Sequence, residues 1–124
     1  MRFEVETESP VDTVDVTDRV AGGIPRGRNG TVTVFCRHTT AGVVVNEAEP
    51  RLLADIESFA DALAPGAGWS HDEIDDNADA HLKSMLLGRS VTLPVMDGAL
   101  DLGTYQSVLL VDCDGPRVRS LDVV

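Results

Sequence analysis

The amino-acid sequence predicts an α+β fold, a mainly antiparallel β-sheet or sandwich with two principal helices grouped mid-chain, in a single compact domain over residues 1–124. Most strand patterns are neighbours in the sequence and are joined by short turns, which is typical of antiparallel sheets. The two clearest helix patterns follow one another instead of alternating with strands. No repeat or linker interrupts the 124 residues, a length that can bury one core without disulfide support.

The first part of the chain predicts three strands and one short helix. Alternating apolar and polar residues predict the strands, and His38, at the end of the second, shares a face with Val34 and Cys36. Asp15 or Thr17 can cap the short helix. The strands cover residues 1–9 (MRFEVETES), 30–38 (GTVTVFCRH) and 43–47 (VVVNE), and the helix covers residues 15–23 (DVTDRVAGG).

The middle of the chain predicts two helices separated by an acidic loop. Pro50 suits the first position of the first helix, which carries an apolar stripe at helical spacing, namely Leu52, Ile56, Phe59 and Leu63, widened by Leu53 and Ala60. The second helix is predicted over residues 78–87, with Asp76 or Asn77 at its start and Gly88 at its end. We expect Leu82 and Leu86 on its apolar side.

The last third of the chain reads as β-structure. The turn signals are Met96-Asp97-Gly98 and Asp114-Gly115-Pro116. They separate strand patterns over residues 89–95 (RSVTLPV), 99–102 (ALDL), 104–113 (TYQSVLLVDC) and 117–124 (RVRSLDVV).

Composition and charge narrow the function classes. The net charge is −11, which disfavours nucleic-acid binding because the protein's field repels phosphates. Nine arginines accompany a single lysine, Lys83, a balance that predicts a salt-loving source organism. No apolar run approaches the ~20 residues of a membrane span, and the charged start lacks a signal-peptide core, so we expect a cytoplasmic protein. Cys36 and Cys113 lie in apolar runs and are expected to be buried thiols.

The three histidines are the first candidates for chemistry. His38 ends a strand, His71 lies in the acidic loop, and His81 lies on the second helix, on one face with Asn77 and Ser84. If the fold brings the three imidazoles together, they form a catalytic zinc site with one open position. The alternative is that each histidine is a surface residue or a hydrogen-bonded core residue.

A second group of candidates lies in residues 81–90, HLKSMLLGRS. The cations Lys83 and Arg89 lie next to the hydroxyl groups of Ser84 and Ser90 and to Gly88. Positive charge is scarce in this chain, so the combination predicts an anion-binding site. Alternatively, these cations only complement the carboxyl end of a helix. Gln106 is a weaker candidate for orienting a substrate. The acidic run over residues 72–76 is typical of a solvated loop, and neither a GxSxG motif nor a glycine-rich phosphate loop is present.

Three blocks of the sequence resemble the YjbQ-like family, proteins described as secondary thiamine-phosphate synthases. The blocks are HTTAGVVVNEAEP, HDEIDDNADAHLKSMLLGRSVTLPV and DGALDLGTYQSVLLVDCDGPR, and they run from about His38 to Arg117. The sequence departs from the family pattern at Tyr105, where tryptophan is usual, at Ser107-Val108, and at Ala48 within the NENE block. The first two departures alter one wall of the expected pocket and none of the expected ligands.

The resemblance implies a compact α+β subunit that assembles as a homotrimer. It implies a divalent metal, zinc foremost and magnesium as the alternative for a diphosphate substrate, held by His38, His71 and His81. His38, Glu47 and His81 would be catalytic. Asn46, Asn77, Lys83, Ser84 and Gln106 match further polar positions of the family pattern, and with Arg89 they are the predicted substrate- or anion-binding residues.

The implied reaction joins hydroxymethylpyrimidine diphosphate to thiazole phosphate and gives thiamine phosphate and pyrophosphate, either as the main activity or as a side reaction. It requires neutralisation of the leaving diphosphate, by metal, Lys83 and Arg89, and shielding of a pyrimidine cation, by carboxylates such as Glu47. Two alternatives remain: a non-catalytic protein that binds a metal or a small anion, and a structural oligomer whose histidines only hydrogen-bond.

Overall fold

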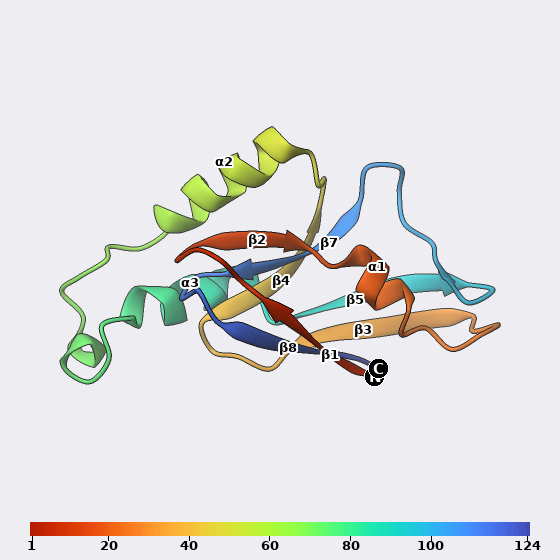
Figure 1. Ribbon diagram of the computed structural model, residues 1–124, viewed down its shortest axis with the longest axis horizontal. Coiled ribbons are helices and arrows are strands. Elements are labelled where there is room, and N and C mark those ends of the chain that lie inside the picture. The colour runs from red at the N-terminus through yellow and green to blue at the C-terminus, as the bar shows by residue number, and fades with distance from the viewer.

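A computed structural model describes residues 1–124 and confirms the α+β fold with antiparallel sheets. Two sheets lie over one another, and the helices lie outside them, mainly at one end (Figure 1). The five-stranded sheet has the order β1 (Arg2–Glu6), β8 (Val118–Val123), β3 (Gly30–Cys36), β5 (Ser90–Met96) and β6 (Ala99–Leu100). The three-stranded sheet has the order β2 (Asp12–Asp15), β7 (Ser107–Asp112) and β4 (Ala41–Asn46).

The helices are α1 (Thr17–Ala21), α2 (Pro50–Asp61) and α3 (Ala78–Leu87), with a 3-10 turn, η1 (Ser70–Glu73), inside the acidic loop. None of them has the length and apolar character that a membrane crossing requires. The strand β2 was not predicted, because its four residues are too short to show alternation. Pairing with β7 forms it, from Asp12 opposite Asp112 to Asp15 opposite Leu109.

The main core lies between the two sheets. It contains Val32 and Val34 from β3, Leu121 from β8, and Val108 and Leu110 from β7, all at most 2% exposed. A smaller cluster covers the other face of β7, where Val111 packs with Ala60 of α2 and Ala80 of α3. Because both faces of β7 are covered, its sequence is a continuous apolar run instead of an alternating one.

The helix α2 contacts the sheet through Ala60, which belongs to the predicted apolar stripe, and not through Phe59. Pro50 is its first residue, as predicted, and Glu49 before it accepts a hydrogen bond from the Leu52 amide at 2.7 Å. Phe59, expected in the buried stripe, is 65% exposed, whereas Ala60 is fully buried. The helix approaches β7 through this small residue, which turns the neighbouring Phe59 toward solvent.

The helix α3 has the predicted bounds but buries an unexpected face. Ala80, Lys83 and Ser84 are buried, while Leu86 is 70% exposed. Its first free amide, on Ala78, is capped by the Asp72 carboxylate at 3.2 Å and not by Asp76 or Asn77. Gly88 ends the helix with a φ of 88°, as its position predicts.

Close packing of α3 on β4 makes Gly42 sensitive to substitution. A Cβ added at Gly42 would lie 2.6 Å from the Gly88 carbonyl oxygen and 2.8 Å from the Leu87 Cβ. We expect Gly42→Ala to lower the free energy of unfolding by about 1–3 kcal/mol, because the two backbones must separate. Urea denaturation would measure this change. Gly66→Ala is the matched control, since its added Cβ meets nothing within 4 Å, and an equal effect in both variants would contradict the packing argument.

Both cysteines are buried free thiols, as the sequence predicts. Burial raises the pKa of the Cys36 thiol and raises that of Cys113 to about 11. Thiols with raised pKa values are poor nucleophiles near neutral pH, so neither residue is a candidate for covalent chemistry.

Candidate functional site

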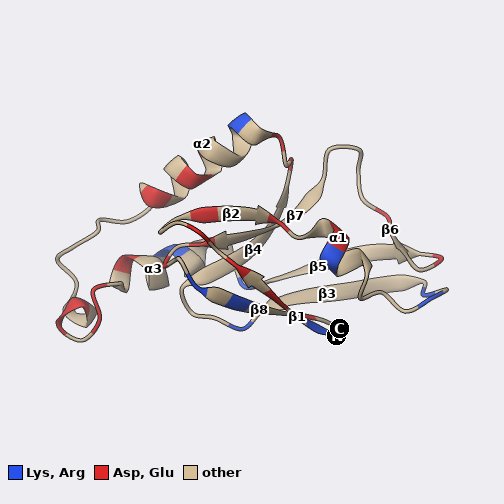
Figure 2. Cartoon of the chain, in the orientation of Figure 1, with Lys and Arg blue, Asp and Glu red and all other residues tan.

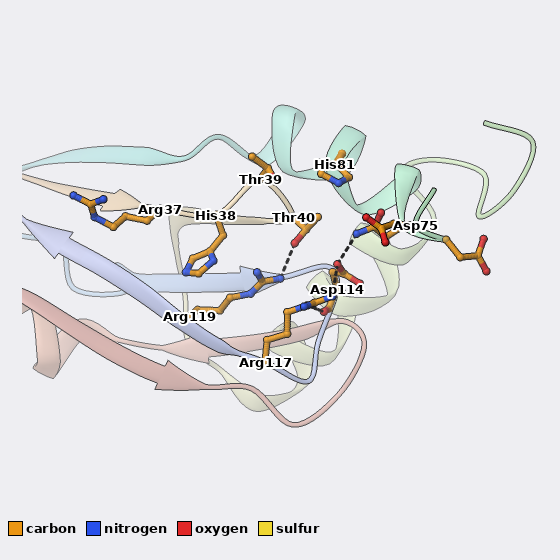
Figure 3. Close-up of a pocket in the computed structure, with 11 residues that line it drawn as sticks. Arg37, His38, Thr39, Thr40, Asp75, His81, Asp114, Arg117 and Arg119 are labelled. Carbon is orange, nitrogen blue, oxygen red and sulfur yellow. Dashed lines mark hydrogen bonds and ion pairs between the residues drawn. The ribbon is translucent and has the colours of Figure 1, made fainter. Parts of the chain in front are cut away.

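A cavity of about 600 Å³ lies where three connections meet, and none of its lining residues is hydrophobic. The connections are the segment between β3 and β4, the segment before α3, and the turn between β7 and β8 (Figure 3). The lining residues are Arg37, His38, Thr39, Thr40, Asp75, Asp76, Asn77, His81, Asp114, Arg117 and Arg119. Three of the predicted site residues, His38, Asn77 and His81, are among them.

A buried ion pair forms the floor of this cavity. The Arg119 guanidinium donates to both carboxylate oxygens of Asp112, at 3.0 and 2.6 Å, and to the Thr40 hydroxyl at 2.8 Å. Thr7 donates a further hydrogen bond of 2.6 Å to Asp112. The Asp112 side chain is fully buried, and that of Arg119 is 3% exposed. The two-pronged geometry fixes the guanidinium plane of Arg119 at the bottom of the cavity.

The pKa of Asp112 is lowered from its ordinary value. Burial by itself raises the pKa, but hydrogen bonds from Arg119, Thr7 and the Asp114 amide lower it by more. Asp112 therefore stays ionised and balances the charge of Arg119.

A second ion pair lies within the β7–β8 turn, and a hydrogen bond from Asn77 joins this turn to the start of α3. Arg117 donates to the Asp114 carboxylate at 3.1 Å and to the Asp114 carbonyl oxygen at 2.8 Å. The Asn77 side-chain amide donates to the same carboxylate at 2.9 Å. The side-chain oxygen of Asn77, Oδ1, is buried without a partner. These contacts hold the acidic loop against the sheet and close one side of the cavity.

The charges in and around the cavity are unevenly distributed. Figure 2 shows basic residues on β8 and acidic residues on α2 and around η1. Three arginines line the cavity near β8, namely Arg37, Arg117 and Arg119. Asp75 lies across from them, on the loop before α3 (Figure 3). Such a cavity can hold a polar ligand whose anionic group faces the arginines.

His38 lies on the wall between Arg37 and Thr39, and its ring contacts β8. The Ser120 amide donates a hydrogen bond of 2.7 Å to the His38 Nε2 atom. Burial is the main cause that lowers the pKa of His38, and the positive charges of Arg119 and Arg117 lower it further. His38 is therefore a neutral imidazole near pH 7.

His71 and His81 contact one another beside the first cavity. Their ring centroids are 4.8 Å apart, and the ring planes make an angle of 84°. Both line a second cavity of about 320 Å³, together with Trp69, Ser70, Ala78 and Leu82. The His71 Nε2 atom is buried and has no hydrogen-bond partner. His81 also lines the first cavity, so it separates a polar space from a partly apolar one.

The three predicted zinc ligands do not form one group within the chain. No set of three or more His, Cys, Asp or Glu side chains is placed to hold a metal ion. The pair His71 and His81 offers two neighbouring imidazoles, whereas the Nε2 atom of His38 is already an acceptor for Ser120. Because a catalytic zinc site needs three protein ligands, the residues of one chain do not fit it by themselves.

The predicted anion-binding residues of α3 are placed in the protein interior or away from the cavity. Lys83 is 2% exposed and pairs with Asp79 at 2.8 Å and with Asp61 of α2 at 3.9 Å. The Ser84 hydroxyl donates to the Thr39 carbonyl oxygen at 2.6 Å. Arg89 is exposed and does not line the cavity. Lys83 and Ser84 thus connect α3 to its neighbours.

Asn46, Glu47 and Gln106 lie at the far end of the three-stranded sheet. In the β4–β7 pairing, Ala41 opposite Asp112 marks the cavity end, and Asn46 opposite Ser107 marks the other end. The Gln106 side chain accepts a hydrogen bond from the Gly103 amide at 2.8 Å. None of the three residues lines the cavity, so within one chain they are separated from the histidines by the length of β4.

Sequence reasoning missed the arginines and threonines of the cavity. Arg119 lies on the same face of β8 as the apolar residues Leu121 and Val123, so alternation itself places it inward, and the prediction did not use this signal. A second usable signal was Asp112, a carboxylate directly after the apolar run VLLV, because such a residue must be buried with a partner.

Comparison with known proteins places the chain among close relatives. A family model described as "UPF0047 protein YjbQ-like" matches residues 1–124. A UPF0047 protein of Archaeoglobus fulgidus is 46% identical, with 99% of this chain and 98% of the relative covered. One from Methanothermobacter thermautotrophicus is 44% identical, with 96% of this chain and 85% of the relative covered.

Solved structures agree with the fold. The crystal structure of a hypothetical protein from Aeropyrum pernix K1 has a TM-score of 0.90 and 44% identity, covering 100% of this chain and 95% of that one. A conserved hypothetical protein from Thermus thermophilus has a TM-score of 0.90 and 37% identity, covering 100% of this chain and 98% of that one.

Proposed function

Because the chain belongs to the YjbQ-like UPF0047 family, we propose that it is an enzyme that acts on a phosphorylated small molecule in the polar cavity. The specific reaction we propose is the one implied by the sequence blocks, the joining of hydroxymethylpyrimidine diphosphate to thiazole phosphate. In this reaction the thiazole nitrogen forms a bond to the methylene carbon. The carbon–oxygen bond to the diphosphate breaks, and the diphosphate leaves with the electron pair.

The observation that carries this proposal is a wholly polar cavity with three arginines. Arg119 is fixed by Asp112. Arg117 and Arg37 are paired with Asp114 and Asp122, but 53% and 47% of their side chains stay exposed to the cavity and solvent. Guanidinium groups suit phosphate oxygens because they donate two parallel hydrogen bonds. We therefore assign Arg37 and Arg117 to the leaving diphosphate, in place of the buried Lys83.

Positive charge that develops on the pyrimidine carbon needs nearby negative charge. Asp75 and Asp76 line the same cavity, and no ion pair engages either of them. In our proposal these carboxylates take the role that the sequence suggested for Glu47. His81, between the two cavities, contacts the ring-bearing part of the substrate.

The test is diphosphate binding and synthase turnover in Arg117→Ala protein. We expect diphosphate affinity to fall about 10- to 100-fold, because charge-assisted hydrogen bonds of about 1.5–3 kcal/mol are lost. Isothermal titration calorimetry would measure the affinity. Arg51→Ala is the matched control, since it removes the same charge from a 92% exposed side chain outside the cavity. Unchanged affinity in Arg117→Ala would remove the assignment.

The same experiment separates the alternatives. A non-catalytic anion-binding protein would show the loss of affinity in Arg117→Ala but no turnover in the wild type. A structural oligomer would show neither binding nor turnover, and replacing His38 would disturb its assembly. The homotrimer and the cytoplasmic location stay predictions.

The divalent metal also stays a prediction, and no step of the proposal depends on it. If zinc is bound, His71 and His81 are the two neighbouring ligands that one chain supplies. Metal analysis of the wild-type and His81→Ala proteins would decide this point, because equal metal content in both would exclude His81 as a ligand.

A further inference from the structure

The His38 imidazole takes the place of a backbone carbonyl in the β3–β8 ladder. Thr33 and Val124 exchange two backbone hydrogen bonds, and in an antiparallel pair such exchanges recur at every second residue. Starting from Thr33 and Val124, the following exchange positions are Phe35 opposite Asp122 and then Arg37 opposite Ser120. The Arg37 amide does donate to the Ser120 carbonyl oxygen, at 3.3 Å.

The return hydrogen bond of this pair goes to a side chain. The Ser120 amide donates to the His38 Nε2 atom at 2.7 Å and not to the Arg37 carbonyl oxygen. The β3 strand ends at Cys36, and the chain turns away so that the ring fills the vacated position. A buried strand amide needs an acceptor, and the imidazole supplies it.

An acceptor nitrogen carries no proton, and this decides the state of the ring. A neutral imidazole has one protonated and one bare nitrogen, so a bare Nε2 places the proton on Nδ1. Protonating Nε2 would set its N–H against the Ser120 N–H, two donors facing each other. The backbone of β8 therefore fixes both the orientation and the tautomer of His38.

The second ring nitrogen is left for the cavity. His38 lines the cavity. Its Nδ1 atom has no hydrogen-bond partner in the protein, and it is not buried. Arg119, Arg117 and Thr40 line the same cavity as His38 (Figure 3). Thr40 and Arg119 are engaged with one another, which leaves the Nδ1–H group as a free neutral donor beside the arginines.

We infer that His38 binds an anionic oxygen of the ligand as a neutral hydrogen-bond donor through its Nδ1–H group, with Ser120 holding the ring by Nε2. The anionic ligand rests on the function proposed above. In this role His38 is neither a general base nor a metal ligand through Nε2, because the lone pair of Nε2 is already engaged. The ring instead adds a fixed donor to the charged donors of Arg37 and Arg117.

The first test reads the tautomer directly and needs no ligand. Long-range proton–nitrogen correlation spectra of the wild-type protein with ¹⁵N-labelled histidine show which ring nitrogen is protonated at pH 8. The His38 signals are assigned by their absence from the His38→Gln protein. We expect a protonated Nδ1 and a bare Nε2. A protonated Nε2 would overturn the inference whatever the protein binds.

The second test separates the two ring nitrogens by substitution. Asparagine places an amide near the Nδ1 position, where it can still donate into the cavity, but it does not reach Ser120. Glutamine reaches the Nε2 position, where its oxygen can accept from Ser120, but it leaves the cavity without the donor. The probe is inorganic phosphate, and the two readouts are its dissociation constant and the urea midpoint of unfolding.

The two variants are expected to behave in opposite ways. His38→Asn should keep phosphate affinity within about threefold of the wild type and unfold at lower urea. His38→Gln should keep the unfolding midpoint and lose affinity about tenfold, the value of one hydrogen bond to a charged group. Loss of affinity in His38→Asn alone would assign binding to Nε2 and overturn the inference. No phosphate binding by the wild type would contradict the proposed function, while the tautomer is still decided by the spectra.

Discussion

Replacing Asp112 by alanine is expected to lower the free energy of unfolding by about 3–5 kcal/mol, because it leaves the Arg119 guanidinium buried without its counter-charge. Arg119 is 3% exposed and would retain only the Thr40 hydroxyl as a partner. Thr7 would lose Asp112 as an acceptor and keep only the Arg117 carbonyl oxygen, at 3.1 Å. The loss is a large share of the stability of an ordinary domain, about 5–15 kcal/mol.

Urea denaturation of single and double variants would isolate this effect. The double variant Asp112→Leu with Arg119→Met removes both charges and fills the space with apolar groups. We expect it to recover much of the stability lost in Asp112→Ala, since a buried pair contributes little net stability relative to well-packed apolar residues. A loss below about 1 kcal/mol in Asp112→Ala would mean that water reaches Arg119 and that the cavity floor is open.

The same pair gives the protein a defined acid sensitivity. Because the folded-state pKa of Asp112 lies below its unfolded value, its contribution to stability is present above the unfolded pKa. The contribution is lost as the pH falls through the folded pKa, when protonation breaks the Arg119 contacts. Wild-type stability should therefore fall in acid, below the ordinary aspartate pKa of about 3.9, and the double variant should lack this part of the decline.

Replacing Lys83 by alanine is expected to lower the free energy of unfolding by about 2–4 kcal/mol and to leave phosphate affinity unchanged. The first effect follows from the loss of a buried aliphatic stem and of the partner of Asp79. The second follows from the position of Lys83, which does not line the cavity. Denaturant unfolding and calorimetric phosphate titration on the same protein sample would measure both effects.

A matched variant separates charge from packing at this position. Lys83→Met keeps the length of the stem and removes the ammonium group, so we expect a smaller loss than in Lys83→Ala. Weakened phosphate binding with unchanged stability in both variants would contradict this expectation. It would instead return Lys83 to the anion-binding role that the sequence suggested.

The fold was predictable because its signals are local. Alternation, the Pro50 and Gly88 boundaries and the Asp97-Gly98 turn depend on neighbouring residues only, and the strands and helices formed where these signals predicted. The error at Phe59 has a different origin. Helical spacing shows which residues can share a face, but contact with β7 decided that Ala60, and not Phe59, faces the sheet.

The candidate site was only partly predictable, because its residues come from segments far apart in the chain. The histidines and Asn77 stood out as residue types with possible chemistry, and three of these four line the polar cavity. Arg119 carried no such signal. Alternation places Arg119 on the buried face of β8 with Leu121 and Val123, but it does not show that Asp112, from another strand, neutralises the charge there.

The sequence by itself determined the α+β class, the first residue of α2, the bounds of α3 and the membership of the YjbQ-like family, since periodicity, caps and turns act over a few residues. Only the tertiary structure decided which polar groups share a space. Lys83 and His38 are two examples. Lys83 is buried and forms ion pairs with Asp79 and Asp61, and one nitrogen of the His38 ring accepts a hydrogen bond from the Ser120 amide. Both outcomes depend on partners from other elements, which spacing along the chain does not encode.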